Sequence, residues 1–437
     1  MAEDACGDTF GRLTRRVNGT AVLHGFGAAR SWTRTPRAPR LRGPGDPAGC
    51  VRRGVVPASL GLILMILSGC TSTRGPVSRA ETGPVVPGPT PTWSKVLIPP
   101  DVEPVTLTAA GPGMLVGGFA ASRTVKPRLL RIAADGSSTE VPLIAHSGYA
   151  FEARWQSIAS DGDRIIAVGG VAGGAHFNTR WTTWAGSSAG VTEIPQPFET
   201  FGGWGAGDVI GPVLTSAGPA IAGSWQGAKS GLDEAIWLPV GDRWVRQSSA
   251  GSALESTGGV LVGARSATST GAGILLSGSA VHLLDGKVRQ SAAVWRSQRV
   301  NNGWARVDLP DSGASGEAVS AHCDGQNCVV AGYVGGAVAL WRLSRSAATP
   351  IPDVPHVAAN PSSPIPAPLV AGARIIEVVS AGPGIVVLAG GDKDWTLSKG
   401  PIGEATSSAL IGGWVYVIAE RPGGSAVLWR CPVKDLG

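Results

Sequence analysis

Short apolar runs that begin and end at small residues recur along most of the chain. Each run has the length of one β-strand, and turns rich in Gly and Pro separate it from the next run. Most copies lie about 50–57 residues apart, although the last interval is near 30. The copies span residues 113–118, 162–170, 218–223, 273–278, 326–332, 384–390 and 413–419. This spacing indicates an internal repeat.

Each repeat contains further strands. A second strand that carries a Trp usually follows the apolar run, as at 180–184, 235–237, 293–296, 339–342 and 427–430. A third element ends toward a Pro, as at 191–195 and 304–310. Alternating short strands broken by Gly and Pro turns are typical of antiparallel sheet. Four short strands in about 50 residues, repeated six or seven times, predict an all-β fold, a β-propeller.

We expect seven blades, and six blades remain the alternative because the sixth repeat is short. The segment 93–99, which begins at Trp93, matches 304–310 position by position in residue type, and the last repeat lacks such a strand. Pairing this N-terminal strand with the last repeat would close the ring and remove its exposed sheet edges. The alternative folds are paired β-sandwiches or a β-helix. A sandwich does not need seven similar units, and the repeat is too long for a β-helix coil.

The N-terminal region has the layout of a secretory signal. A short basic start at 51–53 precedes an apolar run at 55–67, which falls short of the roughly 20 residues that a membrane-spanning helix needs. The sequence Leu-Ser-Gly-Cys at 67–70 resembles a bacterial lipobox. That resemblance implies cleavage before Cys70 and attachment of a diacylglyceryl group to its sulfur. A simple cleaved or retained helix is the alternative.

The chain then divides into four parts. Residues 1–50 are rich in Arg and Pro and lack periodicity, so we expect them to be untranslated or disordered. Residues 51–69 form the signal peptide, and 70–92 form a tether rich in Pro, Gly, Ser and Thr. Residues 93–437 form the propeller. We therefore expect a lipid-anchored protein on the extracytoplasmic face of the cell membrane.

The net charge of +6 does not point to nucleic acid. Residues 1–69 hold 10 Lys or Arg and 4 Asp or Glu, whereas the rest of the chain holds 27 of each kind. A neutral domain offers no electrostatic footprint for a phosphate backbone. We expect no nucleic-acid partner.

Two cysteines lie close together in a predicted hairpin. Cys323 and Cys328 flank a four-residue turn, which in an exported protein predicts a disulfide. The alternative is a metal site that adds His322 and Asp324, but no second pair with ligand spacing is present. We expect no metal and no cofactor. Cys431 shares a strand with Trp429 and is expected to be a small buried residue.

Aromatic residues in the predicted connections between strands are the candidate binding residues. Those on strands are expected to pack between blades. If the predicted strand order holds, connections between blades and those between second and third strands lie on one face of the ring. A cluster of aromatic side chains would then cover the first three blades, where its alternative role is to pack the loops onto the domain. The candidates are Tyr149, Phe151, Trp155, His176, Phe177, Phe201 and Trp204.

The pattern favours a binding module over an enzyme. Strand-Gly-Gly followed by Trp resembles kelch repeats but lacks their usual Tyr, and 297–304 resembles a sialidase Asp-box with Arg299 and Asn301 at the Asp and Gly positions. Neither resemblance allows an active site of that family to be assigned to residues of this chain. We expect a ligand- or protein-binding scaffold of the cell envelope, with a saccharide or a protein as its partner. The alternative is a carbohydrate-active hydrolase or lyase with a carboxylate pair at the channel mouth, because a glycosidase needs only two carboxylates close in space.

Overall fold

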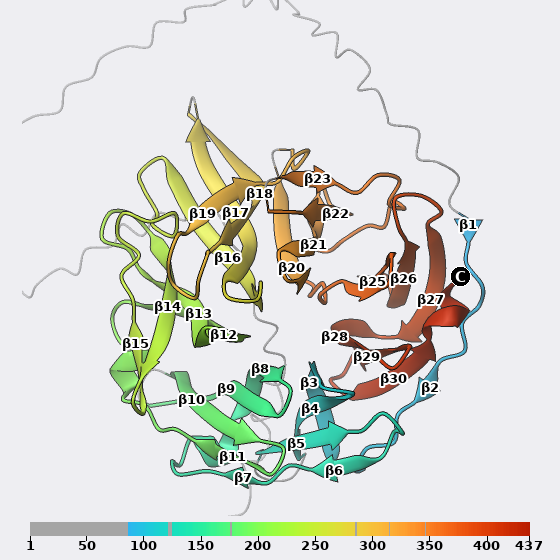
Figure 1. Ribbon diagram of the computed structural model, residues 1–437, viewed down its shortest axis with the longest axis horizontal. Coiled ribbons are helices and arrows are strands. Elements are labelled where there is room, and N and C mark those ends of the chain that lie inside the picture. The colour runs from blue at the N-terminus through green and yellow to red at the C-terminus, as the bar shows by residue number, and fades with distance from the viewer. Residues whose placement is uncertain (1–85, 121–124, 175–176, 285, 314, 346) are drawn as a thin grey trace, which may run out of the picture. The chain divides into compact units, whose positions relative to one another are not determined.

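Seven β-sheets arranged around a central axis form the folded part of the chain (Figure 1). The computed structural model describes residues 86–437 except 121–124, 175–176, 285, 314 and 346. The expected all-β propeller is confirmed, with seven blades rather than six. The predicted extension, signal peptide and Cys70 lie outside the described residues. Within the described part of the chain, no helix is long and apolar enough to cross a membrane.

Blades 1 to 5 follow one another along the chain. Blade 1 consists of β3 (Val102–Ala110), β4 (Gly113–Ala120), β5 (Lys126–Ile132) and β6 (Ser138–Glu140). Blade 2 consists of β8 (Arg154–Asp161), β9 (Arg164–Gly173), β10 (Asn178–Ser187) and β11 (Gly190–Glu193), with β7 (Leu143–Ile144) added in parallel outside β11. Blade 3 consists of β12 (Ala206–Thr215), β13 (Gly218–Gln226), β14 (Leu232–Val240) and β15 (Arg243–Arg246). Blade 4 consists of β16 (Val260–Ser269), β17 (Ile274–Leu284), β18 (Lys287–Arg296) and β19 (Ala305–Asp308), and blade 5 of β20 (Gly316–Asp324), β21 (Asn327–Val334), β22 (Ala337–Leu343) and β23 (Ala348–Pro350).

The last two blades take their outermost strands from the N-terminal end of the domain. Blade 6 contains β24 (Leu369–Ala371), β25 (Arg374–Ala381), β26 (Gly384–Gly390) and β27 (Thr396–Ile402), and β1 (Val86–Pro87) pairs in parallel outside β27. Blade 7 contains β28 (Glu404–Ile411), β29 (Trp414–Glu420) and β30 (Ala426–Pro432), and β2 (Ser94–Lys95) pairs with β30. Closure by the strand around Trp93 is therefore confirmed. The pairing of β1 also shows that the end of the predicted tether lies against blade 6.

The sixth repeat is not short once its strands are assigned. Its apolar run at 384–390 is β26, the third strand from the axis, whereas the equivalent runs of the other blades are second strands. The second strand of blade 6 is β25, and the first, β24, has only three residues. Because β24 has only three residues, the sequence pattern matched the third strand of blade 6 to the second strands of the other blades.

The core lies between neighbouring blades. The indole rings of Trp184, Trp237, Trp295 and Trp341, all on third strands, are at most 1 % exposed. Large aromatic rings fill the space between adjacent twisted sheets, as the sequence pattern predicts. In six of the seven blades the register between the first and second strand shifts at one point, which is a β-bulge. A bulge increases local twist, which suits a strand next to the axis.

Antiparallel order within each blade gives the ring two distinct faces. One face carries the connections between blades and the turns between second and third strands, and we call it the connection face. The opposite face carries the remaining turns, and we call it the lower face. The start of β1 lies on the lower face, because Val86 pairs with Thr396 at the start of β27 and Leu436, near the C-terminus, contacts Thr396. Short 3-10 turns at Ala150–Glu152 (η1) and Phe198–Thr200 (η2) lie on the connection face, and Val433–Leu436 (η3) follows β30.

Candidate binding face

Exposed aromatic side chains gather on the connection face over blades 2 and 3. Phe151 is 59 % exposed, Phe177 80 % and Trp204 98 %, and Tyr149 is 44 % exposed. Tyr149 and Phe151 come from the connection into blade 2, Phe177 from the β9–β10 turn, and Trp204 from the connection into blade 3. We call these four residues, together with Arg180 and Phe198, the aromatic face.

Arg180 joins two of the connections. The central carbon of its guanidinium group lies 4.0 Å from the ring centroid of Phe198 and 6.0 Å from that of Tyr149. A guanidinium over an aromatic ring is attracted by the negative face of the ring. The buried Nε of Arg180 has no hydrogen-bond partner among the described residues. The sequence pattern did not single out Arg180 because it stands on β10, where a polar residue predicts only an exposed position.

Buried polar groups hold the connections that carry these rings. The carboxylate of Glu193, at the end of β11, accepts hydrogen bonds from the backbone N–H groups of His146 and Ser147 at 2.6 and 2.7 Å. It also accepts one from the Ser147 hydroxyl at 2.6 Å. The indole N–H of Trp237 donates to the carbonyl oxygen of Thr200 at 2.8 Å, which fixes the connection after Phe198. These bonds hold the connections that lead into blades 2 and 3.

Phe177 is presented by a strained backbone. Its φ of 53° lies in the left-handed region, which a bulky residue rarely adopts. The preceding turn is closed by a hydrogen bond from the Phe177 N–H to the carbonyl oxygen of Gly174. An outlier of this kind costs about 1–3 kcal/mol and recurs at functional sites. The predicted His176 lies outside the described residues.

Two predicted members of the site do not belong to it. Trp155 is 3 % exposed, donates its indole N–H to the carbonyl oxygen of Arg128, and packs edge-on against Trp184 with ring centroids 5.5 Å apart. Phe201 is 4 % exposed and packs on Trp237 at 5.3 Å. Both were expected on the exposed face, and that expectation is wrong. Each follows a 3-10 turn by a few residues, where the chain turns back into the core.

Three carboxylates lie at the ends of strands of blades 7 and 1 on the connection face. Glu103 is on β3, and Glu404 on β28 pairs directly with Glu420 on β29. Burial raises the pKa of Glu103, and the charge of Glu420 adds to this effect, while the charge of Arg154 and the N–H of Ala426 oppose it. The charge of Glu420, on β29 of blade 7, therefore acts on Glu103, on β3 of blade 1.

The cysteines behave as structural residues. Cys323 and Cys328 form a disulfide across the β20–β21 hairpin. Cys431 is a buried free thiol, and burial raises its pKa to about 11, with a smaller contribution from Asp435. Among the described residues, no group of three or more His, Cys, Asp or Glu side chains is placed to hold a metal ion.

Comparison with known proteins finds no family for this chain. No protein-family model matches the chain, and no curated protein matches it. Among solved structures, the β-propeller domain of the Trilobed protease from Pyrococcus furiosus is 9 % identical with a TM-score of 0.48, and the match covers 76 % of this chain and 95 % of that one. A puromycin-hydrolyzing peptidase of Mycobacterium tuberculosis is 12 % identical with a TM-score of 0.46 (80 % and 55 % covered), and Trypanosoma rangeli sialidase is 9 % identical with a TM-score of 0.42 (77 % and 55 % covered). These similarities concern the propeller fold alone.

Proposed function

We propose that this protein is a lipid-anchored, extracytoplasmic binding module of the cell envelope that holds a saccharide or protein partner on its aromatic face. The observation that carries the proposal is the exposure of Tyr149, Phe151, Phe177 and Trp204 on one face of the ring. Large aromatic side chains left in water on adjoining loops are typical of binding surfaces.

The energetics favour binding at this face. Burying one large apolar side chain contributes roughly 1.5–3 kcal/mol, and a rigid ring loses little conformational entropy when it is fixed. Four such rings contribute roughly 6–12 kcal/mol, which is of the same order as the cost of association of about 4–15 kcal/mol, so micromolar binding also needs polar contacts beside the rings. Arg180 adds a cation next to Phe198 and Tyr149 for a partner's hydrogen-bond acceptors.

The entry point of the chain is compatible with anchoring at Cys70. The described chain reaches the propeller at β1, which starts on the lower face. We expect metabolic labelling with a fatty-acid analogue to mark the protein, and Cys70→Ala to remove the label.

The binding proposal is tested by thermal unfolding of the purified protein with envelope saccharides and peptides. A ligand at one hundred times its dissociation constant adds about 2.7 kcal/mol to the free energy of unfolding. We expect Trp204→Ala to abolish this gain. Leu97→Ala is the matched control, because Leu97 is 86 % exposed and outside the aromatic face. For a protein partner, photo-crosslinking from position 177 in cells should capture it, and position 97 should not.

The proposal fails if position 177 captures nothing that position 97 does not and no ligand gives a shift that depends on Trp204. Loss of binding in both Trp204→Ala and Leu97→Ala would also contradict it, since the effect would then not belong to the aromatic face.

The second candidate is a carbohydrate-active hydrolase or lyase, and the carboxylates of Glu103, Glu404 and Glu420 favour it. A carboxyl group with a raised pKa next to a second carboxylate can serve as a general acid. In that case Glu103→Gln should lower the release of reducing ends or unsaturated products from polysaccharide by about 100-fold or more, without lowering the thermal unfolding midpoint. Equal product release by Glu103→Gln and the unaltered protein excludes this mechanism.

A further inference from the structure

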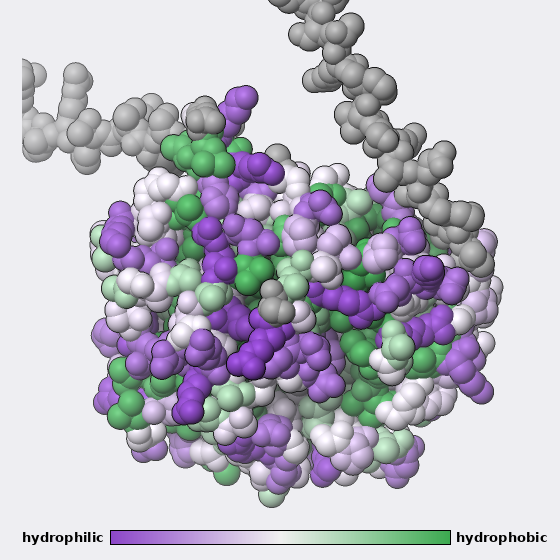
Figure 2. All heavy atoms as spheres, turned by 45° about the horizontal axis from the view of Figure 1, so that its top comes forward, coloured by the Kyte–Doolittle hydropathy of each residue, from purple (hydrophilic) through white to green (hydrophobic). Residues whose placement is uncertain are grey.

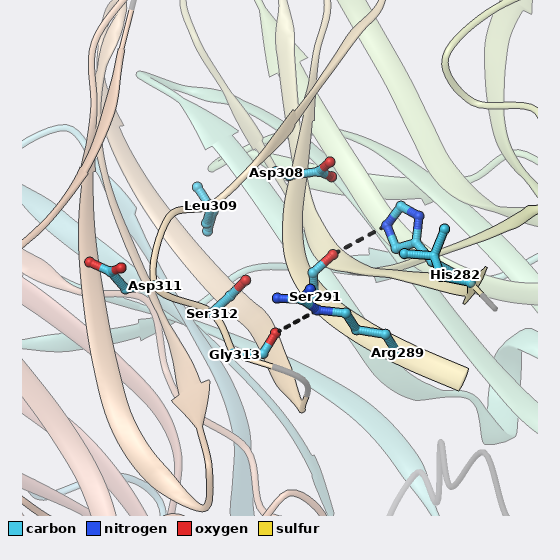
Figure 3. A pocket seen from close by; sticks show the side chains of 9 residues that line it. His282, Arg289, Ser291, Asp308, Leu309, Asp311, Ser312 and Gly313 are labelled. Atoms are coloured by element: carbon cyan, nitrogen blue, oxygen red, sulfur yellow. Dashed lines mark hydrogen bonds between the residues drawn. The ribbon is translucent and has the colours of Figure 1, made fainter. Parts of the chain in front are cut away.

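A groove on the connection face between blades 4 and 5 is separate from the aromatic face. Its volume is about 630 Å³, within the range of small-molecule sites. One wall is the long β17–β18 hairpin, and the other is the connection from β19 to β20 (Figure 3). The lining residues are His282, Leu284, Arg289, Ser291, Asp308, Leu309, Asp311, Ser312 and Gly313.

The hairpin that forms the first wall projects beyond the ring. Its strands have 11 and 10 residues, and the side chains of Leu283, Leu284 and Val288 near its tip are 58 %, 53 % and 73 % exposed. Figure 2 shows apolar residues where this hairpin projects at the upper left, with hydrophilic residues around them. Leu284 lies on the groove side of this wall and gives the groove an apolar rim.

Arg289 is held in an orientation that leaves its two terminal nitrogens available. Its Nε donates a hydrogen bond to the carbonyl oxygen of Gly313 at 3.2 Å, across the groove from its own strand. Among the described residues, its guanidinium makes no other hydrogen bond or ion pair. A guanidinium fixed through Nε presents its two remaining nitrogens as a fork, which matches the two oxygens of a carboxylate.

Hydroxyl and imidazole groups continue the polar lining beside this fork. The Ser291 hydroxyl lies 3.3 Å from Nε2 of His282, and Figure 3 shows Ser291 between His282 and Arg289. Ser312 is 6 % exposed and precedes the residue that orients Arg289. These groups can both donate and accept hydrogen bonds.

Two carboxylates complete the lining and restrict the charge of a ligand. Asp308 pairs with Arg306 at 3.1 Å, so its charge is largely balanced. Asp311 has no partner among the described residues. The unbalanced charge of Asp311 repels a phosphate dianion more strongly than a single carboxylate, so the Arg289 fork favours the singly charged ligand. Hydroxyl or ammonium groups of the same ligand would find acceptors in Asp308 and Asp311.

We propose that this groove binds a small carboxylate ligand that carries hydroxyl or ammonium groups next to its carboxylate. The Arg289 fork holds the carboxylate, Ser291, Ser312 and His282 bond the adjoining polar atoms, and Leu284 and Leu309 cover the carbon skeleton. A sugar acid and an α-amino acid share this chemistry. The site does not depend on the aromatic face, so either can fail without the other.

The test uses isothermal titration of the full-length protein with two matched pairs of probes. D-glucuronate and D-glucose differ in the carboxylate, as do L-alanine and L-alaninamide. We expect one carboxylate probe to bind with a dissociation constant below about 10 mM. Its uncharged counterpart should bind at least about ten-fold more weakly. Binding of D-glucuronate would indicate a sugar acid as the ligand, and binding of L-alanine would indicate an amino acid.

The variants assign the binding to the groove. We expect Arg289→Gln to weaken binding of the carboxylate probe about ten-fold or more, and Ser291→Ala to weaken it less. Arg243→Gln is the control, because Arg243 is an exposed arginine on β15 in blade 3. Absence of binding by both carboxylate probes, equal binding of charged and uncharged members of a pair, or unchanged binding in Arg289→Gln would each overturn the proposal.

Discussion

Glu377 stands on β25 with its side chain wholly buried, and neither of its carboxylate oxygens has a hydrogen-bond partner among the described residues. Its strand neighbours on the same face, Ile375 and Val379, belong to the apolar core between blades 5 and 6. Burial raises the pKa of Glu377 well above its usual value, and the nearby N–H of Val378 opposes this weakly. The folded protein therefore keeps this carboxyl protonated at pH values where the unfolded chain ionises it.

This difference makes stability depend on pH in a defined direction. Below the unfolded pKa of about 4.5 both states are protonated, and Glu377 has no effect on the pH dependence. Between that value and the raised folded pKa, only the unfolded chain loses the proton. The free energy of unfolding then falls by about 1.4 kcal/mol per pH unit from this residue.

We expect Glu377→Met to remove this loss, because Met has a similar length and no charge. The gain in unfolding free energy over the unaltered protein should be small at pH 4.5 and should increase toward pH 7.5. Urea denaturation at four pH values measures it. Glu199→Met is an exposed control in which no increasing gain is expected. A constant difference between Glu377→Met and the unaltered protein at all pH values would contradict a raised pKa.

At the scale of elements, the indole groups tie connections to blades in a recurring way. Trp237 and Trp341, on the third strands of blades 3 and 5, donate their N–H to the carbonyl oxygens of Thr200 and Pro310 in the connections that lead into those blades. Trp395, directly before β27, donates in the same way to Pro352. Each bond satisfies a polar indole atom that the core would otherwise leave unpaired. The same residues that fill the core therefore also position the connection face.

The short first strand of blade 6 shows where element patterns mislead. β24 has three residues, so the strand that follows it was not recognised as the second strand of its blade. The apolar content of β25 and β26 is similar, because both are buried on two faces. Periodicity cannot distinguish two such strands, whereas pairing with neighbours can.

At the scale of the whole molecule, the segment 86–98 adds one strand to each of the last two blades and so closes the ring. β1 extends blade 6 and β2 extends blade 7, and between them the indole N–H of Trp93 donates to the carbonyl oxygen of Lys399 at 3.1 Å. Trp93 also packs on the core between blades 6 and 7, and Val96 and Ile98 pack on the core between blades 7 and 1. The segment therefore covers two sheet edges and joins three blades.

Removal of this segment should open the ring. We expect a variant that begins at residue 100 to lose roughly 3–5 kcal/mol of unfolding free energy relative to one that begins at Val86, because the partly buried Trp93 and the pairing of β1 and β2 are removed together. It should also associate at high concentration, because the edges of β27 and β30 become available for pairing. Urea denaturation and size-exclusion chromatography measure the two effects. Equal unfolding midpoints for the two variants would show that the closure does not stabilise the fold.

The sequence by itself determined the all-β class, the repeat and the closing strand, because these follow from local periodicity and from similarity between segments. It also determined the disulfide between Cys323 and Cys328, which are neighbours across one tight turn. Among the candidate residues, Tyr149, Phe151, Phe177 and Trp204 are exposed, as the sequence pattern predicts. All of these depend on residues close together in the chain or on strand order.

Only the tertiary structure decided which aromatic residues face solvent and which polar groups converge. Trp155 and Phe201 are in the core because each fills a space between two neighbouring blades. No sequence pattern indicated the roles of Arg180, Glu193 and Glu377 or the groove at Arg289. Each of them depends on contacts with residues that are distant in the chain. Burial, charge and pairing are properties of contacts between distant segments, so they are settled only when the blades pack around the axis.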